Sequence, residues 1–235
     1  MIGLHQLSCK NPKSTSWFTY CAKRLSIYDL DTYEIILGNL RSSTIKTAIL
    51  NHWNYKLRDE ASSKSSLKYL YIDACNIQHP HPVWQTLMCN PVETRQSIQK
   101  VRLLCGTFIL QSSKAAFNQF QVDPTCPLCG TEPEDRIHLI LRCPSLVDIR
   151  AKYTVELSKL CPEFTDFKDE DKVKTLLDSN YLKTRGIGCE IADLEAISRI
   201  FIYSTTCKRT RLLNEKEGGF KKLNYEVGFE GIFET

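Results

Sequence analysis

The most constraining feature of this chain is the pattern Cys-x2-Cys-x8-His-x4-Cys. Its four residues are Cys126, Cys129, His138 and Cys143. A tetrahedral Zn²⁺ takes thiolate and imidazole ligands, supplied as two close pairs that a turn brings together. Pro127 and Gly130 suit the turns of the first pair, and HLILRC predicts a short helix for the second. Four protein ligands leave no open position, so the pattern predicts one structural zinc ion.

The first two cysteines alone would be ambiguous, because a thioredoxin-like redox pair has the same spacing. The added histidine and third cysteine favour a metal site, and no strand-turn-helix pattern surrounds the pair. A redox pair, or four unrelated residues, stays open as an alternative. Metal binding would also supply the free energy to order the short polar segment TEPEDR between the two pairs.

Composition is that of an ordinary soluble protein, with 235 residues, 42% hydrophobic and 25% charged. The chain has no apolar run of about 18 residues and no apolar signal-peptide core. We therefore expect no membrane partner and an intracellular location, in the nucleus, the cytoplasm or both. The 11 cysteines are scattered, and we expect them to be reduced thiols.

Apolar residues recur at helical spacing over six stretches, which predicts a mainly α fold with helical arms around a small zinc module. These stretches are 14–40, 43–60, 93–111, 143–160, 171–182 and 189–214. We expect Asp29 and Asp31 to break or cap helices, Gly38-Asn39 to end one, and Ser43 or Thr44 to cap the next. Segment 163–172 (EFTDFKDEDK) predicts an acidic loop.

The stretch 93–111 is a second clear amphipathic helix in the pattern. Its expected apolar stripe consists of Ile98, Val101, Cys105 and Phe108. Arg95, Gln99 and Arg102 fall on another face. The chain divides into a flexible N-terminus 1–13, a helical linker region 14–92, a basic helix with the zinc-binding module 93–160, a C-terminal helical region 161–214 and a flexible tail 215–235.

Basic residues are in excess before and around the zinc pattern, which suits a phosphate-contacting surface. The candidate nucleic-acid contacts are Arg95, Lys100, Arg102, Lys114, Arg136, Arg142, Arg150 and Lys152. A solvated helix face is the alternative for such a cluster. Lys208, Arg209 and Arg211 form a second basic patch, or the charged last turn of a helix.

Two further sets of residues have both a functional and a simpler structural interpretation. Phe117, Phe120 and Tyr153 could stack on bases, but their spacing favours core packing. A second metal site would draw on Cys75, His79, His81 and Cys89. Both of these histidines precede a proline, which forces an extended backbone, so a solvated or packed loop is favoured over metal binding.

The segment from Glu93 to Arg150 resembles the zinc-binding region that follows the polymerase in reverse transcriptases of non-LTR retrotransposons, most closely the jockey-like group. The motifs that carry the resemblance are RLLCGT at 102–107, CPLC at 126–129, the acidic pair at 134–135, His138 and Cys143. Flanking segments extend it to roughly 14–214. The resemblance implies a nucleic-acid-binding region behind a polymerase domain that this sequence does not include.

The polymerase motif Tyr/Phe-x-Asp-Asp, whose carboxylates hold catalytic metal ions, has no match. The nearest string, Tyr71-Ile72-Asp73-Ala74, lacks the second Asp and is interpreted as chance. No endonuclease, ribonuclease H or nucleotide-binding motif is found. We therefore expect a non-enzymatic module that binds RNA or DNA, with a separate polymerase domain as a candidate partner and no small-molecule substrate.

Two alternatives stay open beside that function. One is a zinc-stabilised protein-interaction domain, in which Trp17, Trp53 and Trp84 would mark apolar surfaces for a partner. The other is a retroelement fragment without independent function. A continuous basic stripe over 95–152 would favour nucleic-acid binding, and an exposed apolar patch would favour a protein partner.

Overall fold

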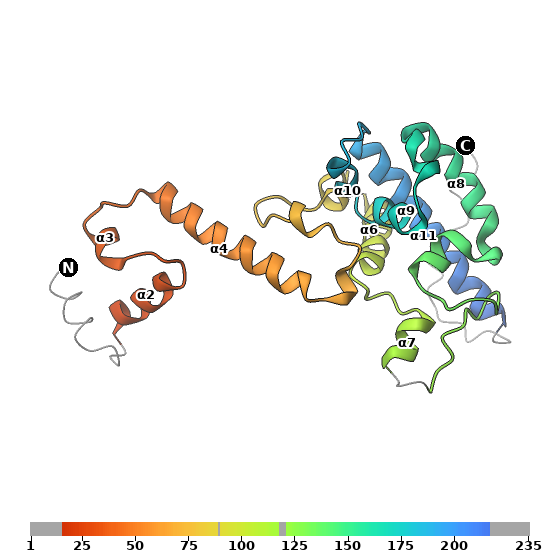
Figure 1. Ribbon diagram of the computed structural model, residues 1–235, viewed down its shortest axis with the longest axis horizontal. Coiled ribbons are helices and arrows are strands. Elements are labelled where there is room, and N and C mark those ends of the chain that lie inside the picture. Colours follow the sequence, from red (N-terminus) through yellow and green to blue (C-terminus); the bar gives the residue numbers. More distant parts are fainter. Residues whose placement is uncertain (1–15, 89, 118–120, 217–235) are drawn as a thin grey trace. The chain divides into compact units, whose positions relative to one another are not determined.

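The computed structural model describes residues 16–88, 90–117 and 121–216 (Figure 1). The predicted flexible N-terminus 1–13, the predicted tail from 217 onward, Cys89 and Phe120 lie outside the described residues. Glu215 and Lys216, which were predicted to belong to the tail, still belong to a helix.

The described residues are mainly helical and contain no β-strand, which confirms the predicted fold class. The contacts within the chain group it into two compact units, and in the sequence the boundary lies between His81 and Pro82. No helix within the described ranges is both long and apolar enough to cross a membrane.

The first unit holds three α-helices and two short 3-10 turns in its described part. They are α2 (Trp17–Ser26), α3 (Thr32–Ile36), α4 (Ser42–Ser62), η1 (Ser65–Leu67) and η2 (Ile72–Ala74). Asp31 caps α3 as predicted, with its carboxylate accepting from the backbone of Tyr33 at 2.8 Å. Gly38, at φ 78°, follows the end of this helix as predicted.

Helix α4 differs from the prediction at its start. It begins at Ser42 after Arg41, with no side-chain cap, so the predicted caps at Ser43 and Thr44 are wrong. Only Ala61 of this 21-residue helix is buried. Trp53 and Leu57, from its apolar stripe, are about two-fifths exposed.

The second unit carries the zinc pattern and most of the core. Its described elements are α5 (Pro82–Gln85), α6 (Pro91–Leu104), α7 (Gln111–Phe117), η3 (His138–Arg142), η4 (Pro144–Leu146), α8 (Val147–Leu160), η5 (Pro162–Asp166), α9 (Asp169–Leu177), α10 (Asn180–Thr184) and α11 (Ile191–Lys216). Asp169, Glu170 and Asp171 form the first turn of α9, where the helix dipole favours carboxylates. Part of the predicted acidic loop is therefore helical.

Helix α11 is the centre of this unit, and α5, α6, α8 and α9 all pack against it (Figure 1). Its Leu194, Phe201 and Ile202 are buried, as are Leu103 of α6 and Leu157 of α8, and the Phe201 ring lies 5.5 Å from the ring of Tyr153 on α8. The core thus brings together segments 93–160 and 161–214, which the sequence analysis treated as separate regions.

Helix α6 buries a different face from the one predicted. Its buried residues are Ser97, Lys100, Leu103 and Leu104, whereas Ile98 of the predicted stripe is 45% exposed. Lys100 Nζ lies 2.7 Å from Glu195 Oε2 and 2.6 Å from Ser198 Oγ of α11. The predicted nucleic-acid contact at Lys100 is therefore wrong, because its side chain is fully buried in an ion pair.

Replacing one member of this ion pair should destabilise the protein far more than replacing both members together. Lys100→Met leaves the buried Glu195 carboxylate without its counter-charge, so we expect the free energy of unfolding to fall by about 3–5 kcal/mol. The double variant Lys100→Met/Glu195→Leu should recover most of that loss. Denaturant titration followed by circular dichroism measures both, with exposed Lys183→Met as the control. Equal losses in the single and double variants would contradict this view of the pair.

Candidate metal centre

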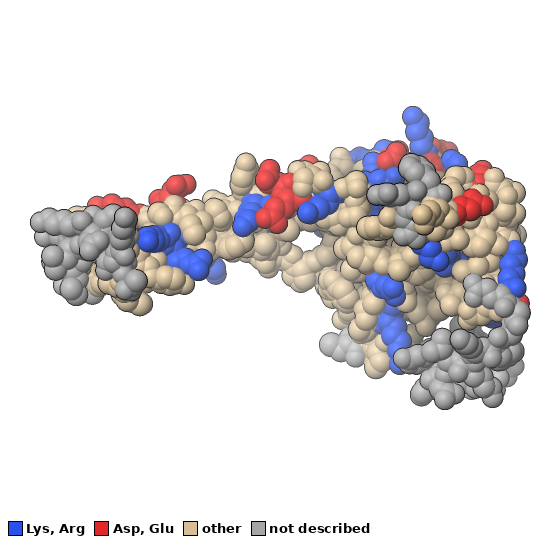
Figure 2. All heavy atoms as spheres, turned by 90° about the horizontal axis from the view of Figure 1, so that it is seen from below, with Lys and Arg blue, Asp and Glu red and all other residues tan. Residues whose placement is uncertain are grey.

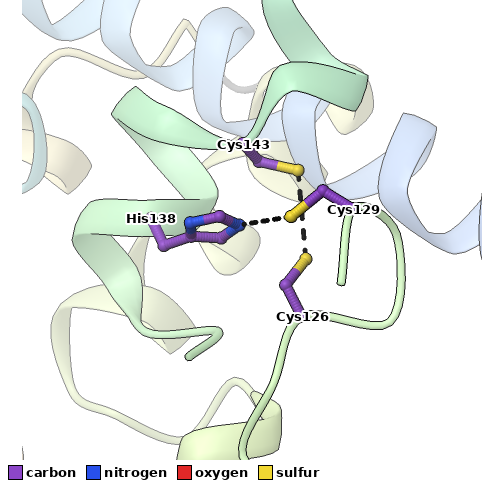
Figure 3. A group of neighbouring side chains, drawn as sticks. All are labelled: Cys126, Cys129, His138 and Cys143. Atoms are coloured by element: carbon purple, nitrogen blue, oxygen red, sulfur yellow. Dashed lines mark hydrogen bonds between the residues drawn. The ribbon is translucent and has the colours of Figure 1, made fainter. Parts of the chain in front are cut away.

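Four ligand atoms from the predicted pattern converge in the second unit (Figure 3). They belong to Cys126, Cys129, His138 and Cys143, and all lie within 4.8 Å of one another. Sγ of Cys126 and Sγ of Cys143 are 3.9 Å apart, and Sγ of Cys129 is 3.3 Å from Nε2 of His138. A tetrahedral ion bonded at about 2.3 Å to sulfur and 2.0 Å to nitrogen has edges of roughly 3.5–3.8 Å. The cluster therefore fits a metal ion.

The first ligand pair lies on a tight turn. The Gly130 amide donates to the Cys126 carbonyl at 2.8 Å, and Gly130 adopts φ 69°, a left-handed conformation that suits glycine. The backbone N–H groups of Leu128 and Cys129 donate to the Cys126 sulfur. This turn points both sulfur atoms to the same side.

Two backbone hydrogen bonds then close residues 124–134 into a hairpin. They join the Cys126 amide to the Glu132 carbonyl at 2.8 Å and the Glu134 amide to the Pro124 carbonyl at 2.9 Å. We call residues 124–143 the metal loop.

The second ligand pair lies at the two ends of the short helix η3, as the sequence predicted. The His138 amide donates to the Asp135 carboxylate at 2.7 Å, which starts this helix. His138 Nδ1 lies 3.2 Å from Glu132 Oε2, so the ring presents Nε2 to the sulfur cluster. A carboxylate on the far nitrogen is the usual way in which a metal-binding histidine is oriented.

The three thiols differ in acidity in the metal-free chain. Burial raises the pKa of the Cys126 thiol to about 12 and also raises the pKa of Cys143. Burial opposes ionisation of Cys129 too, but hydrogen bonds from Thr131 and Cys126 outweigh it and lower its pKa to about 6. Because a metal takes thiolates, its binding must displace protons from Cys126 and Cys143.

We expect this difference to appear as selective alkylation. In metal-free protein at pH 7, iodoacetamide should modify Cys129 well before Cys126, since a pKa of about 6 leaves mainly thiolate and one of about 12 leaves thiol. The Cys129 rate should fall as the pH drops through 6. Peptide mass spectrometry at timed intervals measures both sites, and metal-loaded protein is the control. Equal rates at the two cysteines would contradict the assignment.

Glu134 is a functional residue whose role the sequence did not reveal. Its carboxylate is fully buried and accepts from Nε and Nη2 of Arg209 on α11, at 2.6 and 2.7 Å. The same carboxylate accepts from the Gln111 amide at 3.0 Å, and its backbone carbonyl accepts from Ser112. The metal loop is thereby joined to α11 and to the start of α7. Sequence spacing carries no signal for a pair 75 residues apart.

Some of the predicted nucleic-acid contacts are engaged by other groups of the protein. Besides the buried Lys100, Arg142 pairs with Asp169 at 2.8 Å, although half of its side chain is exposed. Arg150 Nη2 donates to the carbonyl of Cys143. Arg136 is only partly exposed.

The other predicted contacts are exposed. They are Arg95, Arg102, Lys114 and Lys152. Within the described part of the chain, no ion pair to a carboxylate engages any of them. Phe117, which follows Lys114 on α7, is 87% exposed, so its predicted core packing is wrong, whereas Tyr153 is buried as predicted.

The second metal set, which the sequence analysis weighed and disfavoured, does not assemble among the described residues. Its Cys75 donates to the carbonyl of Tyr71, and Cys89 lies outside the described residues. Among residues 16–88, 90–117 and 121–216, the cluster at 126–143 is the single group of three or more potential ligands.

Comparison with models of known families, with curated proteins and with solved structures finds no match for this chain. The function is therefore argued from the geometry of the metal centre and of the surface around it. The resemblance to the retrotransposon region stays a prediction.

Proposed function

We propose that the second unit is a helical nucleic-acid-binding module held together by one structural zinc ion. The observation that carries the zinc assignment is the convergence of three sulfur atoms and one imidazole nitrogen within 4.8 Å of one another. Soft thiolates favour zinc over calcium or magnesium, which take oxygen ligands. With four protein ligands the ion has no open position for water or substrate, so its proposed role is non-catalytic.

A bound zinc ion would order the metal loop of this module. Residues 124–137 of the metal loop bury only Cys126 and Leu128 among their apolar side chains, and two ligand pairs must be held at the two ends of the loop. A bound ion would fix the positions of those ends, and the hydrogen bonds of Glu134 would hold α7 and α11 against the loop. The free energy of metal binding would then become folding free energy for residues 111–143.

The nucleic-acid proposal rests on exposed cations beside this loop. Arg102 on α6 lies over the Phe108 ring at 5.7 Å, and Arg209, which binds Glu134, lies over the same ring at 5.7 Å. Exposed Lys114 and Phe117 lie on α7, whose first residue is bound by Glu134. A cation beside an exposed aromatic ring suits a phosphate and a stacked base.

Charge over the whole molecule gives a weaker argument. Figure 2 shows one face, on which basic atoms lie in separate groups with acidic atoms beside several of them. The proposed contact surface is therefore local, and consists of the exposed cations of α6 and α7 together with Phe117. RNA or DNA would be the partner, as the resemblance to the post-polymerase region implies.

A protein-interaction role is the second candidate, and a specific observation favours it. In the first unit Trp17 is 71% exposed and Tyr55 72% exposed. Exposed aromatic side chains mark a protein-interaction site where they form one contiguous patch. A separate polymerase domain is one partner of that description that the resemblance implies.

Removing one ligand tests the zinc proposal. Cys126→Ser should release the metal and loosen residues 111–143, because a hydroxyl is a poor zinc ligand at neutral pH. Cys161→Ser should do neither, although Cys161 is equally buried. Metal content by elemental analysis should be one zinc per wild-type chain, and hydrogen exchange should locate the loosened segment. A wild-type chain without zinc would remove the proposal.

Neutralising the proposed surface tests nucleic-acid binding. We expect Arg102→Gln/Lys114→Gln to weaken binding to single-stranded RNA and to flatten the salt dependence, by a slope of about 0.7 for each lost phosphate contact. Phe117→Ala should weaken binding with little change in that slope, since stacking releases no counterions. Fluorescence anisotropy over a salt series measures each.

The matched control is Lys159→Gln/Lys183→Gln, which removes the same charge from exposed positions on α8 and α10. Equal weakening by the control would mean that only net charge matters and would count against a defined surface. No binding by the wild-type chain, with zinc present, would favour the protein-interaction role.

A further inference from the structure

Two cations outside the ligand set hold backbone carbonyls of the metal loop. Lys216, the last residue of α11, donates to the carbonyls of Pro127 and Leu128 at 2.9 and 2.8 Å. Arg150 of α8 donates through Nη2 to the carbonyl of Cys143. Each cation therefore lies against one of the two turns that carry the ligands. Arg150 is seven residues after Cys143, whereas Lys216 is 88 and 89 residues away from the carbonyls that it holds.

The net charge of the metal-bound centre accounts for cations at these positions. Zn²⁺ with three thiolates and a neutral imidazole has a net charge of −1. Cys126 and Cys143 are buried, so water does little to stabilise that charge. Glu132, which contacts the His138 ring, adds a further negative group on the other side.

The surroundings of Arg150 support this assignment. Its Nη1 is buried and has no hydrogen-bond partner among the described residues. The nearby Asp148 carboxylate is already engaged by Lys208. A buried guanidinium nitrogen is costly unless a negative group compensates it. The thiolate of Cys143, whose own carbonyl Arg150 holds, supplies that negative charge when the metal is bound.

We propose that Arg150 and Lys216 are positioning residues of the metal centre, which hold the two ligand-bearing turns by their carbonyls and compensate the negative charge of the three thiolates. This inference rests on the proposed zinc site. It gives Arg150 a role different from the phosphate contact expected from the sequence. It also makes the last turn of α11 part of the metal centre.

The experiment compares zinc affinity and ligand field in matched variants. Arg150→Gln and Lys216→Gln remove the charge and leave a shorter polar side chain. Lys159→Gln on α8 and Arg211→Gln on α11 make the same charge change at exposed positions. Zinc affinity is measured by competition with a chromophoric chelator, and Co²⁺ absorption reports the ligand set.

We expect each positioning variant to bind zinc about 10–100-fold more weakly, as partners behind a metal ligand typically do. The Co²⁺ spectrum should still show three thiolates and one imidazole. Zinc release during iodoacetamide treatment should be faster, because thiolates without a nearby cation are stronger nucleophiles. Lys216→Arg, which keeps the charge, should restore the affinity.

Three results would overturn the proposal. Zinc affinity equal to that of the controls would do so directly. An equal fall in melting temperature for metal-free and metal-loaded variants would assign these cations to the fold alone. A wild-type chain that takes up neither Zn²⁺ nor Co²⁺ would instead remove the metal site itself, and the chelator assay on the wild type distinguishes that failure from the first two.

Discussion

The buried ion pair between Glu134 and Arg209 connects the metal loop to the rest of the fold. Arg209 is near the end of α11, the helix on which α6 and α8 also pack, so this pair links the metal loop directly to the central helix of the core. Both carboxylate oxygens are used, one by the guanidinium alone and one by the guanidinium together with the first amide of α7. Because a buried charge without its partner is costly, the loop, α7 and α11 are bound to adopt one arrangement together.

Buried ion pairs of this kind do not add much net stability, but they select between packings. Lys100 with Glu195 fixes the rotation and register of α6 on α11, which apolar contacts alone would leave less defined. The amphipathic pattern of α6 pointed to a stripe through Ile98, whereas the observed interface contains a lysine. The fold of the second unit thus depends on two charge pairs, each joining α11 to a segment far away in sequence.

This explains which parts of the structure the sequence could predict. The long helices and the four metal ligands follow from local spacing, since an x2 or x4 interval determines which side chains share a turn. Asp31 as a cap was predictable for the same reason. The predicted helix 93–111 was too long, because α6 ends at Leu104. The partners of Lys100 and Glu134 could not be predicted, because each depends on which helices pack against one another. The exposure of Phe117 was equally unpredictable, because it depends on whether another segment covers α7.

The same reasoning separates the basic residues into two groups. Arg150, Arg142 and Lys100 have partners that only the fold brings near, so a basic segment in sequence is not a basic surface in space. The exposed cations of α6 and α7 are the ones proposed to bind a polyanion, and Glu134 holds the start of α7, the helix that carries Lys114. If zinc fixes the metal loop, then nucleic-acid affinity and zinc occupancy are linked. Each should then strengthen the other by the same factor, since coupling between two binding sites is reciprocal.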